Sequence, residues 1–243
     1  MAGVGIRLEG VSRRLGATQV LDGMSAEFRP GSLNGLIGPD GAGKTTLLRI
    51  VVGLLKPDSG RVVFTEDGRE TPFSAVRPDM AYMPQQQSLY PDLSVEEHLE
   101  FFRDLYRIPA PVYSARRERL LAMTRLGPFA GRPAGQLSGG MYKKLGLMCA
   151  LLQSPKVVLL DEPTNGVDPI SRREFWELLY GLVAGGILVV VSTSYMDEAE
   201  RCSGVFLMEG GTMLASGEPG AVLAREGAAG FEELFLRRAG EKA

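Results

Sequence analysis

The sequence predicts an α/β fold in which a core of alternating strands and helices is interrupted by a helical insertion. Short apolar runs such as Ile-Leu-Val-Val-Val at 187–191 have the length of buried strands, and amphipathic helical patterns follow several of them. Between about residues 86 and 153 these runs give way to leucine and phenylalanine stripes at helical spacing. At 243 residues the chain can bury a substantial core. We expect a single domain over 1–243, with its core in 1–85 and 154–243 and a helical subdomain in 86–153.

The elements of the core follow one another in a regular order. Val4, Ile6 and Leu8 alternate with small or polar residues, as in a half-buried strand. Pro30-Gly31 then turns the chain into a buried strand at 33–37. Further strands are expected at 61–64, 79–83, 157–160 and 187–191, and helices at 46–52, 95–107, 114–125, 141–152 and 171–183.

Composition narrows the class of protein. The formal net charge is −2 with both signs well mixed, so nothing attracts the chain generally to nucleic acid or anionic lipid. No apolar run approaches the length of a membrane span, and the first ten residues include Arg7 and Glu9, unlike a signal peptide. Cys149 and Cys202 stand in apolar or helical surroundings and are expected to be reduced structural thiols. We expect a soluble cytoplasmic protein.

A glycine-rich motif lies between the expected strand at 33–37 and the helix that follows it. It matches G-x-x-x-x-G-K-[ST] in the order Gly38-Pro39-Asp40-Gly41-Ala42-Gly43-Lys44-Thr45, and Thr46 continues it into the helix. Such a turn points successive backbone N–H groups at a phosphate, and the positive end of the helix adds to the same anion site. Lys44 can reach the β- and γ-phosphates, and the Thr45 hydroxyl can ligate Mg²⁺. The segment predicts a site for a nucleoside triphosphate.

A pair of carboxylates ends the strand expected at 157–160. Asp161, at the carboxyl end of a buried strand beside the phosphate loop, is placed to hold Mg²⁺. Glu162 is expected on the opposite face of the pleat, where it would orient and polarise an attacking water.

The segment Leu137-Ser138-Gly139-Gly140-Met141 gives the sequence a specific resemblance. Ser138, two glycines and a helix start form a second anion-binding device in one chain. With the other motifs at family spacing, from about Val4 to the terminal helix at 231–236, the chain resembles the nucleotide-binding subunit of ATP-binding cassette (ABC) transporters. Stretches at 38–41, 168–173 and 192–200 are similar to ABC-2-type efflux ATPases, above all to the first cassette of tandem multidrug exporters of the YbhF kind.

The resemblance implies a fold, a set of site residues and partners. The fold would be a P-loop NTPase (RecA-like) core with an antiparallel β-subdomain and the inserted helical subdomain. Gln85 would be the Q-loop glutamine, contacting both the metal and the reacting water, and Asp168 the D-loop aspartate. The signature Ser138–Gly140 would close over ATP held by a second cassette, identical or different. Partners would be ABC-2-type transmembrane permease subunits, holding the chain on the inner face of the cell membrane.

Two positions depart from the family pattern. Ser194 stands where the family has its switch histidine, so we expect Mg-ATP binding with slow hydrolysis. The chain's one histidine, His98, lies in the helical insertion and is expected to be an ordinary helix residue. Leu15 stands where an aromatic residue usually stacks on adenine, so we expect weaker base discrimination.

Two other functions stay open. A non-hydrolysing regulatory cassette would lend its intact signature to a catalytically complete partner, although Glu162 weighs against it. A soluble ABC ATPase acting on nucleic acid or ribosomes would carry coiled coils, zinc modules or a basic linker, none of which the sequence shows. Lys143 and Lys144 are expected to be solvated, since two basic residues form no nucleic-acid patch. The sequence does not identify the transported substrate.

Overall fold

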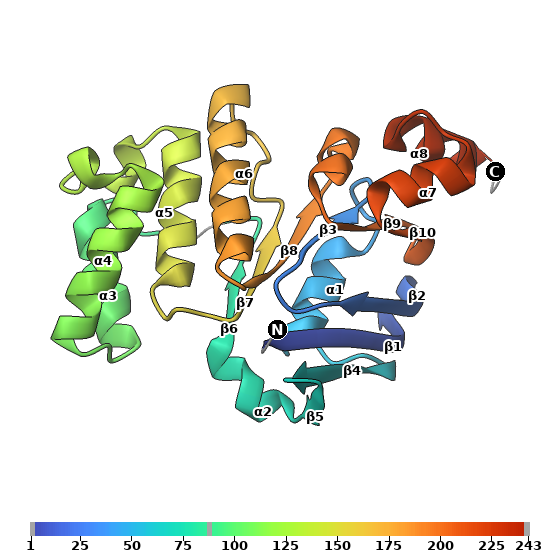
Figure 1. The fold of residues 1–243 in the computed structure, drawn as a ribbon, viewed down its shortest axis with the longest axis horizontal. Helices are drawn as coiled ribbons and strands as arrows, with labels where there is room; N and C mark the ends of the chain where they lie inside the picture. Colours follow the sequence, from blue (N-terminus) through green and yellow to red (C-terminus); the bar gives the residue numbers. More distant parts are fainter. Residues whose placement is uncertain (1–2, 87–88, 241–243) are drawn as a thin grey trace.

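A six-stranded sheet forms the centre of the molecule, in the order β10-β9-β3-β8-β7-β6 (Figure 1). The computed structural model describes residues 3–86 and 89–240. The strands are β3 (Leu33–Ile37), β6 (Met80–Met83), β7 (Val157–Asp161), β8 (Leu188–Thr193), β9 (Gly204–Glu209) and β10 (Thr212–Gly217). The first five are parallel, and β10 pairs antiparallel with β9. Every residue of β3, β7 and β8 is buried, as expected of parallel strands covered on both faces.

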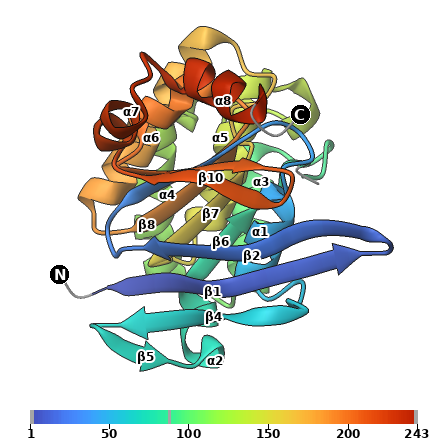
Figure 2. The ribbon, with the colours of Figure 1, turned by 90° about the vertical axis from the view of Figure 1, so that its right-hand side faces the viewer.

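A second, antiparallel sheet has the order β2-β1-β4-β5 and lies beside the central sheet (Figure 2). Its strands are β1 (Val4–Leu15), β2 (Thr18–Phe28), β4 (Ser59–Glu66) and β5 (Arg69–Thr71). The helix α1 (Lys44–Val51) packs between the two sheets, because its buried leucines share one hydrophobic cluster with β1, β7 and β8. The α/β core with an antiparallel β-subdomain is confirmed.

The other face of the central sheet is covered by helices. α6 (Pro169–Ala184) and α5 (Gly139–Leu151) lie nearest the sheet, with α3 (Val95–Leu105) and α4 (Ala110–Thr124) beyond them (Figure 1). Alternate residues of β7 divide between the two faces: Val158 and Leu160 join the cluster under α5 and α6, whereas Val157 and Leu159 face α1.

Shorter elements complete the chain. They are α2 (Phe73–Val76), α7 (Pro219–Glu226) and α8 (Phe231–Gly240), with the 3₁₀ turns η1 (Arg77–Asp79), η2 (Gly127–Phe129), η3 (Ala134–Gln136) and η4 (Met196–Arg201). Across the described ranges, no helix is long and apolar enough to cross a membrane. Cys149 and Cys202 are buried and free, as the sequence predicted.

Candidate functional site

The glycine-rich loop at 38–43 joins β3 to α1 at the carboxyl end of the central sheet. Gly41 and Gly43 have φ of 81° and 101°, in the left-handed region that favours glycine. A Cβ on Gly43 would lie 2.7 Å from the Val20 carbonyl oxygen, and one on Gly38 would lie 2.3 Å from that of Met208. Positive φ and close backbone packing therefore require glycine in this loop.

Lys44 opens α1 and turns its side chain back into the loop. Its Nζ donates to the carbonyl oxygens of Gly38 at 2.6 Å and Pro39 at 3.0 Å. The same ammonium lies 3.2 Å from the Glu162 carboxylate, and both side chains are almost fully buried. The sequence placed Lys44 and Glu162 in one site, and the structure brings them into contact.

Asp161, the last residue of β7, is fully buried and accepts three hydroxyl hydrogen bonds. Thr45 and Ser192 donate to Oδ1 at 3.0 and 2.6 Å, and Tyr82 donates to Oδ2 at 3.2 Å. Burial and the charge of Asp161 raise the pKa of Tyr82 to about 12, so this phenol is protonated near neutral pH.

Glu162 follows β7 with a φ of 46°. The expectation that it takes the opposite face of the pleat is wrong, because the strand has ended and the left-handed residue turns the chain. Its backbone N–H donates to Ser192, while Gln85 and Asn165 donate to its Oε2 at 3.3 and 3.1 Å. One carboxylate oxygen is therefore held by two amides and the other by Lys44.

Lys44, Thr45, Gln85 and Glu162 border a cavity of about 360 Å³. It is lined by the loop and helix residues Asp40, Gly41, Ala42, Gly43, Lys44, Thr45 and Thr46, together with Val20, Gln85 and Glu162. Leu15 lies where the β1–β2 hairpin turns and is 44% exposed. Neither Leu15 nor any signature residue lines the cavity. The predicted set thus includes residues of the phosphate-loop cavity and a second group at the starts of α5 and α6, whereas Leu15, Gly38, Pro39, Asp161 and Ser194 belong to neither.

The signature and the D-loop lie side by side in that second group. Ser138 caps α5 by accepting the Met141 N–H at 3.3 Å, and Asp168 caps α6 by accepting from Ile170 and Ser171. These backbone N–H groups hold the pKa of the exposed Asp168 below its ordinary value. A Cβ on Gly140 would lie 2.4 Å from the Ser171 Cβ, so the two helices touch where they begin.

The switch position, Ser194, comes directly after β8 and is half buried. The preceding Thr193 accepts the Gly38 N–H at 3.2 Å, so this strand end abuts the phosphate loop. The following 3₁₀ turn is anchored by Glu198, which is fully buried and bonded by Thr164, Arg172 and Trp176.

The comparisons with known proteins place these motifs in one family. The family described as "ABC transporter" matches residues 21–165, more than half of the chain. The chain is an ABC transporter ATP-binding domain.

Relatives and solved structures agree with this assignment. The "Probable multidrug ABC transporter ATP-binding protein YbhF" of Escherichia coli K12 is 49% identical over 199 residues, or 82% of this chain and 34% of that protein. The ABC domain described here therefore spans about a third of the length of YbhF. The "Nod factor export ATP-binding protein I" of Ralstonia nicotianae is 38% identical, covering 91% of this chain and 69% of that protein. A solved "ATP binding subunit of ABC transporter" aligns with a TM-score of 0.82 at 28% identity, covering 96% of this chain and 99% of that one.

The helical insertion of this ABC domain contains Lys143, Lys144 and His98. The prediction that Lys144 is solvated is wrong: it is buried and paired with Glu174 at 2.5 Å. Lys143 is half buried and donates to the Gln85 carbonyl oxygen, and burial lowers its pKa. His98 is fully buried and accepts the Tyr90 N–H at Nε2, so it packs within the helical insertion as a helix residue.

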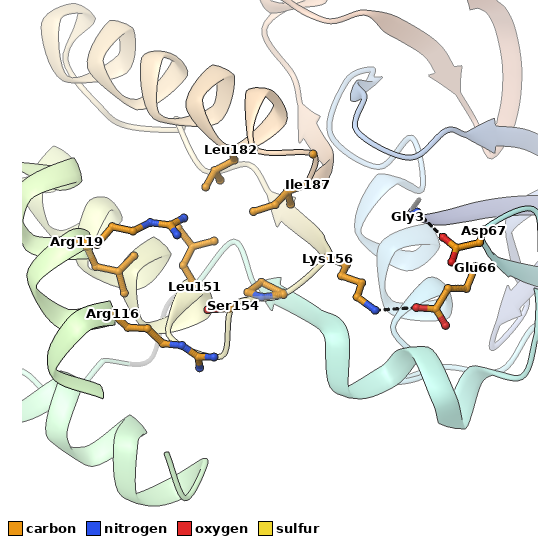
Figure 3. Close-up of a pocket in the computed structure, with 14 residues that line it drawn as sticks. Gly3, Glu66, Asp67, Arg116, Arg119, Leu151, Ser154, Lys156, Leu182 and Ile187 are labelled. Atoms are coloured by element: carbon orange, nitrogen blue, oxygen red, sulfur yellow. Dashed lines mark hydrogen bonds and ion pairs between the residues drawn. The ribbon is translucent and has the colours of Figure 1, made fainter. Parts of the chain in front are cut away.

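A separate cavity of about 450 Å³ lies between the ends of α5 and α6 and the start of β7 (Figure 3). Its side chains include Arg116, Arg119, Leu151, Lys156, Leu182 and Ile187, with Lys156 paired to Glu66 at 2.7 Å. None of its lining residues belongs to the ABC motifs.

Sequence reasoning gave no role to three polar residues that contact the two carboxylates, or to Glu198 in the turn after the switch position. Tyr82 and Ser192 hold Asp161, Asn165 holds Glu162, and Glu198 anchors the turn after the switch position. A signal existed for two of them, because Tyr82 and Ser192 fall near the ends of predicted parallel strands, whose carboxyl ends meet at one edge.

Proposed function

We propose that this domain binds Mg-ATP and hydrolyses it in a site shared with a second cassette, and so drives an ABC-2-type exporter. The printed names of the relatives support export, since they include a multidrug and a Nod factor system. The observation that carries the proposal is the convergence of Lys44, Glu162 and Gln85 on one cavity beside the phosphate loop.

The residues beside the loop fit a magnesium ion. Thr45 and Asp161 bring a hydroxyl and a carboxylate oxygen to 3.0 Å from each other, and Mg²⁺ prefers oxygen ligands. Among the described residues, no group of three acidic, histidine or cysteine side chains could hold a metal by itself. That agrees with Mg²⁺, which usually takes one or two carboxylates plus substrate phosphates. Thr45, Asp161 and Gln85 would hold it, and it would neutralise charge on the phosphates.

The Lys44–Glu162 ion pair suggests how binding prepares hydrolysis. A bound triphosphate attracts Lys44 to its β- and γ-oxygens, which frees Glu162 Oε1 to accept a proton from water. Gln85 and Asn165 keep Oε2 fixed during this exchange. Glu162 is therefore the general base in this proposal, and Gln85 orients the water.

The signature supports a shared site, because Ser138–Gly140 does not line the cavity of its own phosphate loop. The adjacent starts of α5 and α6 present two positive helix ends at one surface. A phosphate held by another cassette fits that surface, and ATP would then join the two cassettes. The permease subunits would change conformation as the two cassettes join and separate at the inner face of the membrane.

The test uses Glu162→Gln, which keeps the shape of the side chain and removes its charge. We expect Mg-ATP binding to persist, phosphate release to fall by at least about a hundredfold, and ATP to bring the variant to dimeric size on gel filtration. Glu209→Gln, at the end of β9, is the matched control and should hydrolyse normally. Wild-type turnover in Glu162→Gln, or absence of ATP binding in the wild type, would contradict the proposal.

A regulatory cassette is the second candidate, favoured by Ser194 alone. It binds Mg-ATP with the same residues but hydrolyses none, and its signature serves a partner's site. Co-purification from membranes would identify both that partner cassette and the permease.

A further inference from the structure

The two oxygens of the Asp161 carboxylate are held from different elements. Thr45 on α1 and Ser192 on β8 both bond Oδ1, whereas Oδ2 is bonded by Tyr82 from β6 at 3.2 Å. β6 lies next to β7 in parallel register, with Tyr82 opposite Leu159. The contact is therefore fixed by the pairing of the two strands and does not depend on a loop.

The direction of the Tyr82 hydrogen bond follows from the chemistry of its two partners. The phenol hydroxyl carries one proton that it can donate. An ionised carboxylate can only accept. The hydroxyl proton of Tyr82 therefore points at Asp161 Oδ2.

We propose that Tyr82 is a positioning residue for the metal site: it fixes the plane of the Asp161 carboxylate so that Asp161 meets Mg²⁺ in one orientation. The inference rests on the proposed Mg-ATP function. Without the phenol, no described side chain would bond Oδ2, and the carboxylate could rotate about the Oδ1 contacts. Groups that orient a metal ligand typically change metal affinity by one to two orders of magnitude when removed.

The test is Tyr82→Phe, which removes one oxygen atom and keeps the ring. Mn²⁺ serves as the probe, and its binding to protein saturated with ADP is followed by electron paramagnetic resonance. We expect the Kd for Mn²⁺ to rise about tenfold. Binding of ADP in EDTA, where no metal is available, should stay unchanged, and the thermal midpoint confirms that the variant folds.

Tyr180→Phe is the matched control, because it removes a phenol oxygen from a half-exposed ring on α6, away from the metal site. It should bind Mn²⁺ like the wild type. A Mn²⁺ Kd within twofold of wild type in Tyr82→Phe would overturn the inference, as would an equal loss of ADP binding in EDTA. If the wild type binds no Mn²⁺ with ADP, the proposed function fails first.

Discussion

Single side chains decide whether the bound nucleotide is hydrolysed. Glu162 and Lys44 are each 4% exposed and lie 3.2 Å apart, so the base and the phosphate-binding cation share one buried position. Ser194 follows the strand end that abuts the phosphate loop, and we expect a serine there to be too short to reach a γ-phosphate. We therefore expect this site to bind Mg-ATP well and to hydrolyse it slowly.

Ser194→His should raise the steady-state ATPase rate of the isolated domain, because an imidazole can reach the γ-phosphate and donate to it. We expect a gain of about tenfold or more, measured as phosphate release at saturating Mg-ATP. Ser74→His, on the exposed surface of α2, controls for adding a histidine anywhere. A folded Ser194→His domain with an unchanged rate would reject the role given to this position.

Leu15 should leave the domain with weak preference between purine bases. Leucine covers a ring by apolar contact but offers no stacking face, so we expect GTP to compete with ATP nearly equally. Leu15→Tyr should favour ATP by about three- to tenfold in nucleotide competition, which corresponds to a stacking gain near 1 kcal/mol. Since Leu15 is 44% exposed, the variant should fold normally. Strict ATP preference in the wild type would refute this assignment.

At the scale of elements, Glu198 connects three segments that the sequence separates. It takes hydrogen bonds from Thr164 after β7, and from Arg172 and Trp176 on α6, while itself lying in η4. The turn that follows the switch position is thereby attached to the helix that starts at the D-loop.

Glu198→Ala should destabilise the domain by on the order of 3 kcal/mol, since it leaves the buried donors of Thr164 and Trp176 without an acceptor and removes one of the two carboxylates paired with Arg172. Urea unfolding measures the loss as a lower midpoint at similar slope. Glu200→Ala, an exposed neighbour in the same turn, should change stability by less than about 0.5 kcal/mol. Equal midpoints for the two variants would show that the network contributes little.

The elements differed in how well the sequence predicted them. The strand at 33–37 was correct at both ends because an apolar run lies between clear turns. The helix expected from 141 begins at Gly139, since Ser138 caps it. β2 was not predicted, because bulges against β1 leave Leu21, Met24 and Phe28 buried at spacings other than two.

The site was predicted motif by motif but not contact by contact. Lys44, Thr45, Asp161, Glu162 and Gln85 come together as expected. The hydroxyls on Asp161 depend on the order β8-β7-β6, which spacing along the chain does not give. The left-handed turn at Glu162 likewise follows from packing and not from strand alternation.

At the scale of the whole molecule, the phosphate-loop cavity and the signature at the start of α5 are separate parts of the surface. No residue at the start of α5 lines the phosphate-loop cavity, which is why we propose that the signature serves a nucleotide held by a second cassette. Under the proposed function, turnover requires two cassettes to pair.

Mixing two inactive variants tests that pairing. Lys44→Ala cannot hold phosphate, and Ser138→Arg blocks the signature, so each alone should show less than about a tenth of wild-type turnover. If the domain pairs with itself, an equal mixture should recover about a quarter of wild-type activity, because half of the pairs then contain one intact site. Ser12→Arg in place of Ser138→Arg controls for an added charge. A mixture as inactive as its components would exclude self-pairing.

The contact between Gly140 and Ser171 also bears on how related sequences should be compared. An alanine at 140 would push α5 away from α6 within a single chain, whether or not any partner ever approaches. Selection for folding alone would keep this glycine in cassettes that have lost hydrolysis. Packing within the chain would admit a larger residue at Gly139, because a Cβ there meets only the Gly166 carbonyl oxygen at 3.8 Å.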